Sequence, residues 1–342
     1  MELKTMLREL CLASGVNGCT EAADVAEKLL SAFTTDIHRD RLGNVWGRLS
    51  SDAPNAPTLL LEAHIDEIGF TVTQIDEQGF LRVAPCGGVD NRALSAAPVT
   101  VMCDPPCNGV FCATPAHLAK DDALLPELTE RGIDVGMSCE EAKAHIPLGT
   151  RAVFAAHFEE LLNERVCAKA LDDRAGVAAV LYMLSMIQGQ TLPIDLVVAF
   201  CVQEELGLRG SKTAAYGIRP DAAIVVDVSF AHTPDADKAF CGVLGGGVML
   251  GVSPVLDVTM TDTLRELAET QDIPLQCEVM GGTTGTDADA VSLTAEGIPT
   301  ALLSIPLRYM HTPAEVVSLR DVEAVARLMA AFVSNGEVPC LD

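Results

Sequence analysis

Basic side chains are scarce in this chain of 342 residues, which carries 23 lysines and arginines against 48 aspartates and glutamates. The net charge of −25 repels phosphate groups and anionic lipid headgroups. A nucleic-acid-binding protein needs a basic stripe, and this sequence has none. We therefore expect no nucleic acid and no membrane surface as a partner.

Long apolar segments are missing as well. The uncharged run at residues 239–256 contains five glycines and a proline, which is typical of a turn-rich loop and strand and not of a bilayer span. Residues 1–15 mix charged side chains among their leucines and therefore lack the apolar core of a signal peptide. The sequence predicts a cytoplasmic protein that does not cross a membrane.

Cysteine is present twelve times, but no C-x-x-C pair occurs. Because the cysteines are scattered through a long chain without a signal peptide, we expect reduced thiols and no disulfides. The tightest group, Cys103, Cys107 and Cys112, has no neighbouring set of histidines and cysteines, which disfavours a structural zinc site there.

The composition is that of a globular enzyme, with 49% hydrophobic and 21% charged residues and no repeat or low-complexity segment. The length suggests two domains, or one large α/β core that carries an insertion. Short β-rich runs are expected at residues 58–63, 196–202, 222–226 and 300–305, and helices at residues 21–33, 175–187, 261–270 and 319–333. This alternation predicts an α/β fold with a mainly parallel, helix-covered sheet.

The pattern changes between residues 70 and 166, where short alternating strands, prolines and an amphipathic stretch at residues 138–144 replace the longer elements. We interpret this segment as an inserted, small β-rich domain within a catalytic domain formed by residues 1–69 and 167–342. The alternative is that these strands extend the main sheet.

Potential metal ligands follow the predicted strands. In an open α/β sheet, ligands bind beyond the carboxyl ends of the strands. The residues at those ends are His64 and Asp66 after the first strand, Glu204 and Glu205 after the second, Asp227 after the third, and His311 a few residues after the fourth. Together they predict a binding site on one edge of the sheet.

Two adjacent aspartates, Asp172 and Asp173, precede the helix predicted from Ala175. One aspartate suffices for an N-cap, so the second aspartate needs a different explanation. Histidines with several carboxylates form a nitrogen and oxygen donor set that suits zinc, cobalt or manganese, and two metals are plausible.

Spacing within these motifs indicates hydrolase chemistry. Residues i and i+2 of a strand point to the same side, so Asp66 can accept a hydrogen bond from His64 and fix its tautomer. Glu204 and Glu205 are neighbours that project differently, so one carboxylate can bind a metal while the other takes a proton from water.

These residues lie in stretches that resemble peptidase family M42, which includes tetrahedral, deblocking and glutamyl aminopeptidases. The matching stretches run along nearly the whole chain and comprise EAHIDEIGF, DNRALSAAPVTV, GVFCATPAHL, IDVGMSCEEA, KALDDRAGV, VQEELGLRGS, IVVDVSFA, GTDADAV and RYMHTPAEVV. The resemblance implies a dinuclear, metal-dependent aminopeptidase that removes N-terminal residues from short peptides. It implies two divalent metal ions per subunit, zinc ahead of cobalt or manganese.

The resemblance also implies a role for each site residue. Asp172 would bridge the metals, His64 and either Glu205 or Asp227 would be terminal ligands on one or the other metal, and His311 would be the other imidazole ligand. Glu204 would be the general base, Asp66 would orient His64, and the peptide bond from Asp172 to Asp173 would be cis.

For the insertion, the resemblance implies a PDZ-like assembly domain within a phosphorylase/hydrolase-like core, and self-association into dimers and tetrahedral dodecamers. Two features have no counterpart that we recognise. His232 is expected to be a surface histidine, and residues 245–247 are three glycines without the strand, lysine and helix context of a phosphate loop.

Two other functions remain open at this point. A metal-free glycosidase would use paired carboxylates, and chelation would leave its activity intact. A catalytically inactive assembly or binding protein could keep the same fold, although it would not need to keep the base and the ligand set. The preferred N-terminal side chain does not follow from these motifs.

Overall fold

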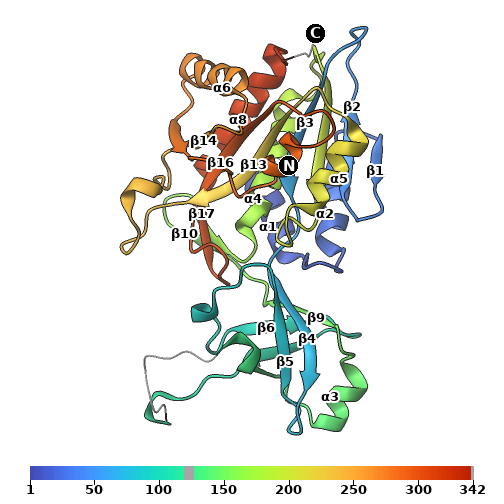
Figure 1. The fold of residues 1–342 in the computed structure, drawn as a ribbon, viewed down its shortest axis with the longest axis vertical. Helices are drawn as coiled ribbons and strands as arrows, with labels where there is room; N and C mark the ends of the chain where they lie inside the picture. Colours follow the sequence, from blue (N-terminus) through green and yellow to red (C-terminus); the bar gives the residue numbers. More distant parts are fainter. Residues whose placement is uncertain (119–126, 340–342) are drawn as a thin grey trace.

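The chain forms two separate β-structures, a large sheet and a closed barrel (Figure 1). The computed structural model describes residues 1–118 and 127–339. The large sheet has 11 strands and accounts for both flanks of the sequence. The barrel lies between them in the sequence and below them in Figure 1.

The large sheet places its longest strands at its centre. Its main path runs in the order β1 (Ile37–Arg39), β2 (Val45–Leu49), β12 (Asp195–Cys201), β3 (Thr58–His64), β13 (Ala222–Phe230), β16 (Thr300–Arg308), β17 (Glu315–Ser318), β11 (Arg165–Ala168) and β10 (Phe158–Leu161). Two further strands, β14 (Val248–Val252) and β15 (Leu275–Val279), continue from β16 off this path.

Pairing in this sheet is mixed, whereas the sequence predicted a mainly parallel sheet. Strands β12, β3, β13 and β16 are parallel, as are β14 and β15. The remaining pairs are antiparallel. Several of these outer strands have only three to five residues, which is too short for a periodic signal in the sequence.

Helices cover both faces of the large sheet. They are α1 (Leu3–Leu12), α2 (Glu21–Leu30), α4 (Leu171–Ile187), α5 (Arg209–Ile218), α6 (Val258–Thr270), α7 (Ala288–Ser292) and α8 (Leu319–Asn335). Alternate residues of β3 face opposite sides, because side chains of a strand have a period of two. Leu59 and Leu61 belong to the hydrophobic core between the sheet and helices α1, α2, α4, α6 and α8. Leu60 belongs to a second hydrophobic core, which the sheet shares with α5 and α7. The predicted helix-covered α/β fold is confirmed.

The barrel has its own hydrophobic core. Its strands are β4 (Gly69–Ile75), β5 (Leu81–Cys86), β6 (Pro98–Val101), β7 (Cys107–Phe111), β8 (Gly132–Asp134) and β9 (Arg151–Phe154). Phe70 packs edge-on against Phe111 and Phe154, with ring centroids 4.8 and 5.5 Å away. Helix α3 (Cys139–His145) begins at a capping box formed by Ser138 and Glu141.

Short 3₁₀ helices complete the connections: η1 (Asn91–Ala93), η2 (Ala116–Leu118), η3 (Leu128–Glu130) and η4 (Lys238–Phe240). Strand β10 falls within the predicted insertion of residues 70–166, yet it pairs with β11 in the large sheet. Residues 119–126 of that insertion lie outside the described residues. The exact domain boundaries therefore stay a prediction.

Over residues 1–118 and 127–339, no helix is both long and apolar enough to cross a membrane. The cysteines of the same ranges are free thiols, as expected, and Cys340 lies outside them.

Candidate metal centre

A cavity of about 610 Å³ lies at the carboxyl ends of the central strands. Its walls include six of the predicted site residues, namely His64, Asp172, Glu204, Glu205, Asp227 and His311. They come from segments far apart in the sequence, since β3, β12, β13, β16 and the start of α4 each contribute to this edge. The structure therefore brings these predicted residues together.

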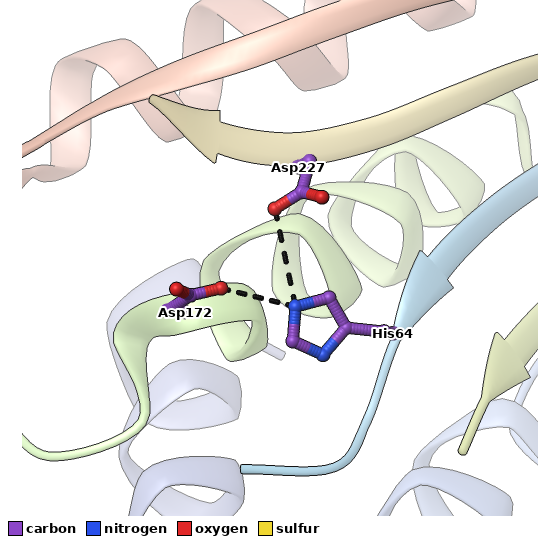
Figure 2. Close-up of side chains that lie close together, drawn as sticks. All are labelled: His64, Asp172 and Asp227. Atoms are coloured by element: carbon purple, nitrogen blue, oxygen red, sulfur yellow. Dashed lines mark hydrogen bonds and ion pairs between the residues drawn. The ribbon is translucent and has the colours of Figure 1, made fainter. Parts of the chain in front are cut away.

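His64 lies between two carboxylates (Figure 2). Its Nε2 atom is 3.0 Å from Oδ1 of Asp172 and 3.9 Å from Oδ1 of Asp227. One donor atom from each of the three residues fits within 4.8 Å of the others, and all three side chains are buried. This group, which we call site A, offers one imidazole nitrogen and two carboxylates.

A second donor group shares Asp172. The Nε2 atom of His311 is 3.2 Å from Oδ2 of Asp172 and 3.2 Å from Oε1 of Glu205. Asp172, Glu205 and His311 again offer donor atoms within 4.8 Å of one another, and we call them site B. The two oxygens of Asp172 thus face different groups, as a bridging carboxylate would require.

Asp66 contacts the ring of His64 in site A and also the segment that follows β12. Its Oδ1 atom is 3.5 Å from Nδ1 of His64, on the side of the ring that faces away from Asp172. Its carboxylate also accepts the backbone N–H groups of Glu204 at 3.1 Å and Glu205 at 3.3 Å. Asp66 therefore holds the segment after β12 beside the ring of His64.

Glu204 lines the same cavity but belongs to neither donor group found among the described residues. Burial raises the pKa of Glu204 to about 9, helped by the charges of Asp227 and Asp287 and opposed by His64. Its carboxyl group is thus placed beside the donor groups without being part of them.

The pKa values of the donors show how strongly their charges interact. Burial raises the pKa of Asp227 well above its usual value, and the charge of Asp172 adds to the shift. Burial alone would lower the pKa of His311, but hydrogen bonds to Asp172 and Glu205 outweigh it and raise the pKa to about 11. For Asp172, burial raises the pKa, but bonds to His311 and His64 lower it below the usual range.

The donor chemistry fits divalent cations. Buried carboxylates repel one another, and a cation placed among them offsets that repulsion. No lysine or arginine lines the cavity in the described part of the chain. Imidazole nitrogens with carboxylate oxygens are ligands that zinc, cobalt and manganese accept.

A carboxylate that the sequence analysis missed supports both sites. Glu315, on β17, accepts the backbone N–H of Asp172 at 3.1 Å and that of His311 at 2.8 Å. Glu315 therefore fixes the main chain of Asp172, which both sites share, and of His311, a ligand of site B. The peptide bond between Asp172 and Asp173 is cis, as the resemblance implied.

A buried ion pair involves Lys169, three residues before Asp172. Lys169 donates to both carboxylate oxygens of Glu67, at 2.9 and 2.7 Å, and the two side chains are 1% and 2% exposed. Arg174 approaches the same carboxylate at 3.7 Å and donates to the carbonyl of Leu10 at 2.7 Å. These contacts tie the segment around Asp172 to the end of α1.

The two unexplained sequence features contribute no residue to the donor groups found among the described residues. His232 is half-buried, and its carbonyl accepts a hydrogen bond from Arg308 at 2.8 Å. In the glycine run, the N–H groups of Gly245 and Gly247 donate to Asp321 of α8, at 2.6 and 2.8 Å. The run therefore holds a carboxylate of the protein itself.

Comparisons with known proteins find relatives along most of the chain. A family model described as M42 glutamyl aminopeptidase matches residues 43–328. A lysyl aminopeptidase from Pyrococcus furiosus is 32% identical over an alignment of 338 positions that covers 96% of each chain. An aminopeptidase from the archaeon Desulfurococcus kamchatkensis superposes with a TM-score of 0.90 at 35% identity, covering 97% of this chain and 94% of the other.

A further solved structure is the TET1 peptidase of Pyrococcus horikoshii, described as able to assemble into a tetrahedron or a large octahedral shell. It is 30% identical with a TM-score of 0.86, and the match covers 97% of this chain and 99% of that one.

Proposed function

Because the chain belongs to the M42 glutamyl aminopeptidase family and is a peptidase, we propose that it is a dinuclear aminopeptidase that removes N-terminal residues from short peptides. The observation that carries the proposal is the pair of donor groups that share Asp172 within one cavity. Such a pair offers room for two cations and for a peptide end beside them.

We assign one cation to site A, with His64, Asp172 and Asp227, and one to site B, with Asp172, Glu205 and His311. Bound divalent cations polarise a scissile carbonyl and lower the pKa of water towards about 7. Zinc is the first candidate from the donor set, and cobalt or manganese would also be accepted.

Glu204 is the proposed general base. It would take a proton from the attacking water and return it to the leaving amine, so that no net proton is consumed at the carboxylate. Its position inside the cavity but outside both donor groups supports this role. Asp66 is a positioning residue, because it faces the second ring nitrogen of His64 and holds the backbone of Glu204.

Two matched variants test the roles of the adjacent glutamates. Glu204→Gln is nearly isosteric but cannot take up a proton, so we expect retained metal and a loss of turnover of about 10²–10⁴-fold. Glu205→Gln should lose metal first and activity as a consequence. Glu266→Gln, on the exposed part of α6, serves as the control.

Metal content and hydrolysis of aminoacyl-nitroanilides are measured on all three variants and on the wild type after chelation. If Glu204→Gln keeps near wild-type turnover, the base assignment is wrong. If peptide hydrolysis survives complete removal of metal, the metal-dependent mechanism is wrong. A glycosidase activity that survives the same chelation would favour the paired-carboxylate alternative.

We also propose that the inserted segment of residues 70–166 is a PDZ-like assembly domain, through which the chain self-associates into dimers and a tetrahedral dodecamer. The tetrahedral assembly of the TET1 relative supports this proposal. So do two exposed leucines of this segment, Leu118 and Leu148, at 72% and 66% exposure. The cytoplasmic location expected from the sequence stays a prediction.

A further inference from the structure

Part of the cavity lining belongs to neither site A nor site B and has a different character. It includes the apolar side chains of Phe230, Met249, Val279 and Met280. Among them lies Glu278, on β15, the one carboxylate in the described lining that belongs neither to a donor group nor to the proposed base. This wall combines an apolar surface with a single negative charge.

Two serine hydroxyls hold Glu278 in place. Ser304 donates to its Oε2 atom at 2.7 Å, and Ser229 donates to its Oε1 atom. No lysine or arginine of the described residues forms an ion pair with it, although its carboxylate is half-buried. A carboxylate accepts more than one hydrogen bond on each oxygen, so both oxygens keep the capacity to bind a cationic group.

Register places this carboxylate a short distance from the metal ligands. Ser304 lies directly opposite Asp227 in the parallel pairing of β16 with β13. Neighbouring strands are about 5 Å apart, so Ser304 lies about that far from Asp227. Ser304 in turn donates a hydrogen bond to Glu278, which therefore lies one side-chain contact further from Asp227. In Figure 1, β13, β16 and β14 lie side by side in the upper part of the molecule.

This separation matches a long cationic side chain. Lysine and arginine carry a charged group on an apolar stem, which can lie along an apolar wall while the charge meets a carboxylate. An acidic side chain would instead meet the charge of Glu278 with no lysine or arginine in the described lining to offset it. An uncharged side chain would leave Glu278 without a cationic partner.

We propose that Glu278 is a specificity-determining residue that binds the side chain of the substrate's N-terminal lysine or arginine. The proposal rests on the proposed aminopeptidase function and names the substrate class of the same cavity. Glu278 acts on the bound side chain and takes no part in the proton transfer.

A different role for Glu278 is binding of the substrate's free α-amino group. Every aminopeptidase substrate has that group, so its loss would lower the rates for all N-terminal residues equally. A side-chain role affects only cationic residues, and the two roles are therefore separable by substrate.

The test compares wild type, Glu278→Gln and the control Glu266→Gln on the nitroanilides of lysine, arginine, leucine and glutamate. For wild type we expect the highest kcat/KM with lysine and arginine. In Glu278→Gln, we expect kcat/KM to fall roughly 10- to 100-fold for these two, the range of a charge-assisted hydrogen bond, and to stay within about twofold for leucine. In Glu278→Lys, the glutamate substrate should improve.

Inhibition by free L-lysine and L-norleucine gives a readout that does not depend on turnover. The two differ mainly in the terminal ammonium group, so wild type should bind lysine more tightly and Glu278→Gln should lose the difference. An equal loss for all four substrates, with the lysine preference in inhibition retained, would overturn the proposal. So would unchanged selectivity in Glu278→Gln. If wild type cleaves none of the four with metal bound, the proposed function itself fails.

Discussion

The buried pair of Lys169 and Glu67 gives a stability prediction with an internal control. In Lys169→Met, the side chain keeps its length but loses the ammonium group that donates to both oxygens of Glu67. Breaking one partner of a buried ion pair costs about 3–5 kcal/mol, because the other charge stays buried. Arg174, 3.7 Å from Glu67, offsets a part of that cost, so we expect about 3 kcal/mol.

The matched control is Lys4→Met. Lys4 also forms a pair with a glutamate, Glu160, at 3.0 Å, but the two side chains are 41% and 57% exposed. Exposed pairs contribute about 0–1 kcal/mol, so this variant should unfold almost like wild type. The same substitution therefore has two different expected costs, which depend only on burial.

Urea unfolding followed by circular dichroism measures both variants. We expect the free energy of unfolding to differ by about 2 kcal/mol or more between them. Glu67→Leu combined with Lys169→Met should recover none of the loss, since it leaves the buried Arg174 without the carboxylate 3.7 Å away and takes from Gly15 its acceptor on Glu67. If Lys169→Met is as stable as Lys4→Met, the argument from burial is refuted.

Three further predictions concern the rest of the molecule. Static light scattering should give a mass well above the 36.1 kDa of one chain, and a strict monomer at micromolar concentration would contradict assembly. Burial raises the pKa of the Cys11 thiol to about 12, so iodoacetamide at pH 8 should modify the exposed Cys277 and leave Cys11 intact. Modification of Cys11 as early as that of Cys277 would contradict the packing of α1. Glu315→Gln should retain less metal, because one amide oxygen cannot replace a carboxylate that accepts from both Asp172 and His311; unchanged metal content would contradict that support.

Much of the candidate site is predictable from the sequence because its residues follow apolar runs. His64 ends β3, and Asp227 lies within β13 directly after its apolar run, and the continuous hydrophobic sequence of these central parallel strands identifies them. Parallel strands align their carboxyl ends at one edge of the sheet, and this places the donors together. The resemblance then separated the roles, which spacing alone left open.

The supporting contacts are not predictable in this way. Glu315 lies 143 positions from Asp172, and Lys169 lies 102 positions from Glu67, so no local pattern joins either pair. Glu278 lies on β15, whose five residues form no continuous apolar run. The antiparallel outer strands are equally short, and their pairing depends on the sheet that they extend.

The number of cations per chain tests the central claim most directly. Wild type and Asp172→Ala are loaded with zinc, dialysed against metal-free buffer, and assayed for zinc and protein by elemental analysis. Because Asp172 contributes to both sites, we expect two zinc ions per chain in wild type and fewer than one in Asp172→Ala. One ion or none per wild-type chain, or two ions retained by Asp172→Ala, would contradict the dinuclear site.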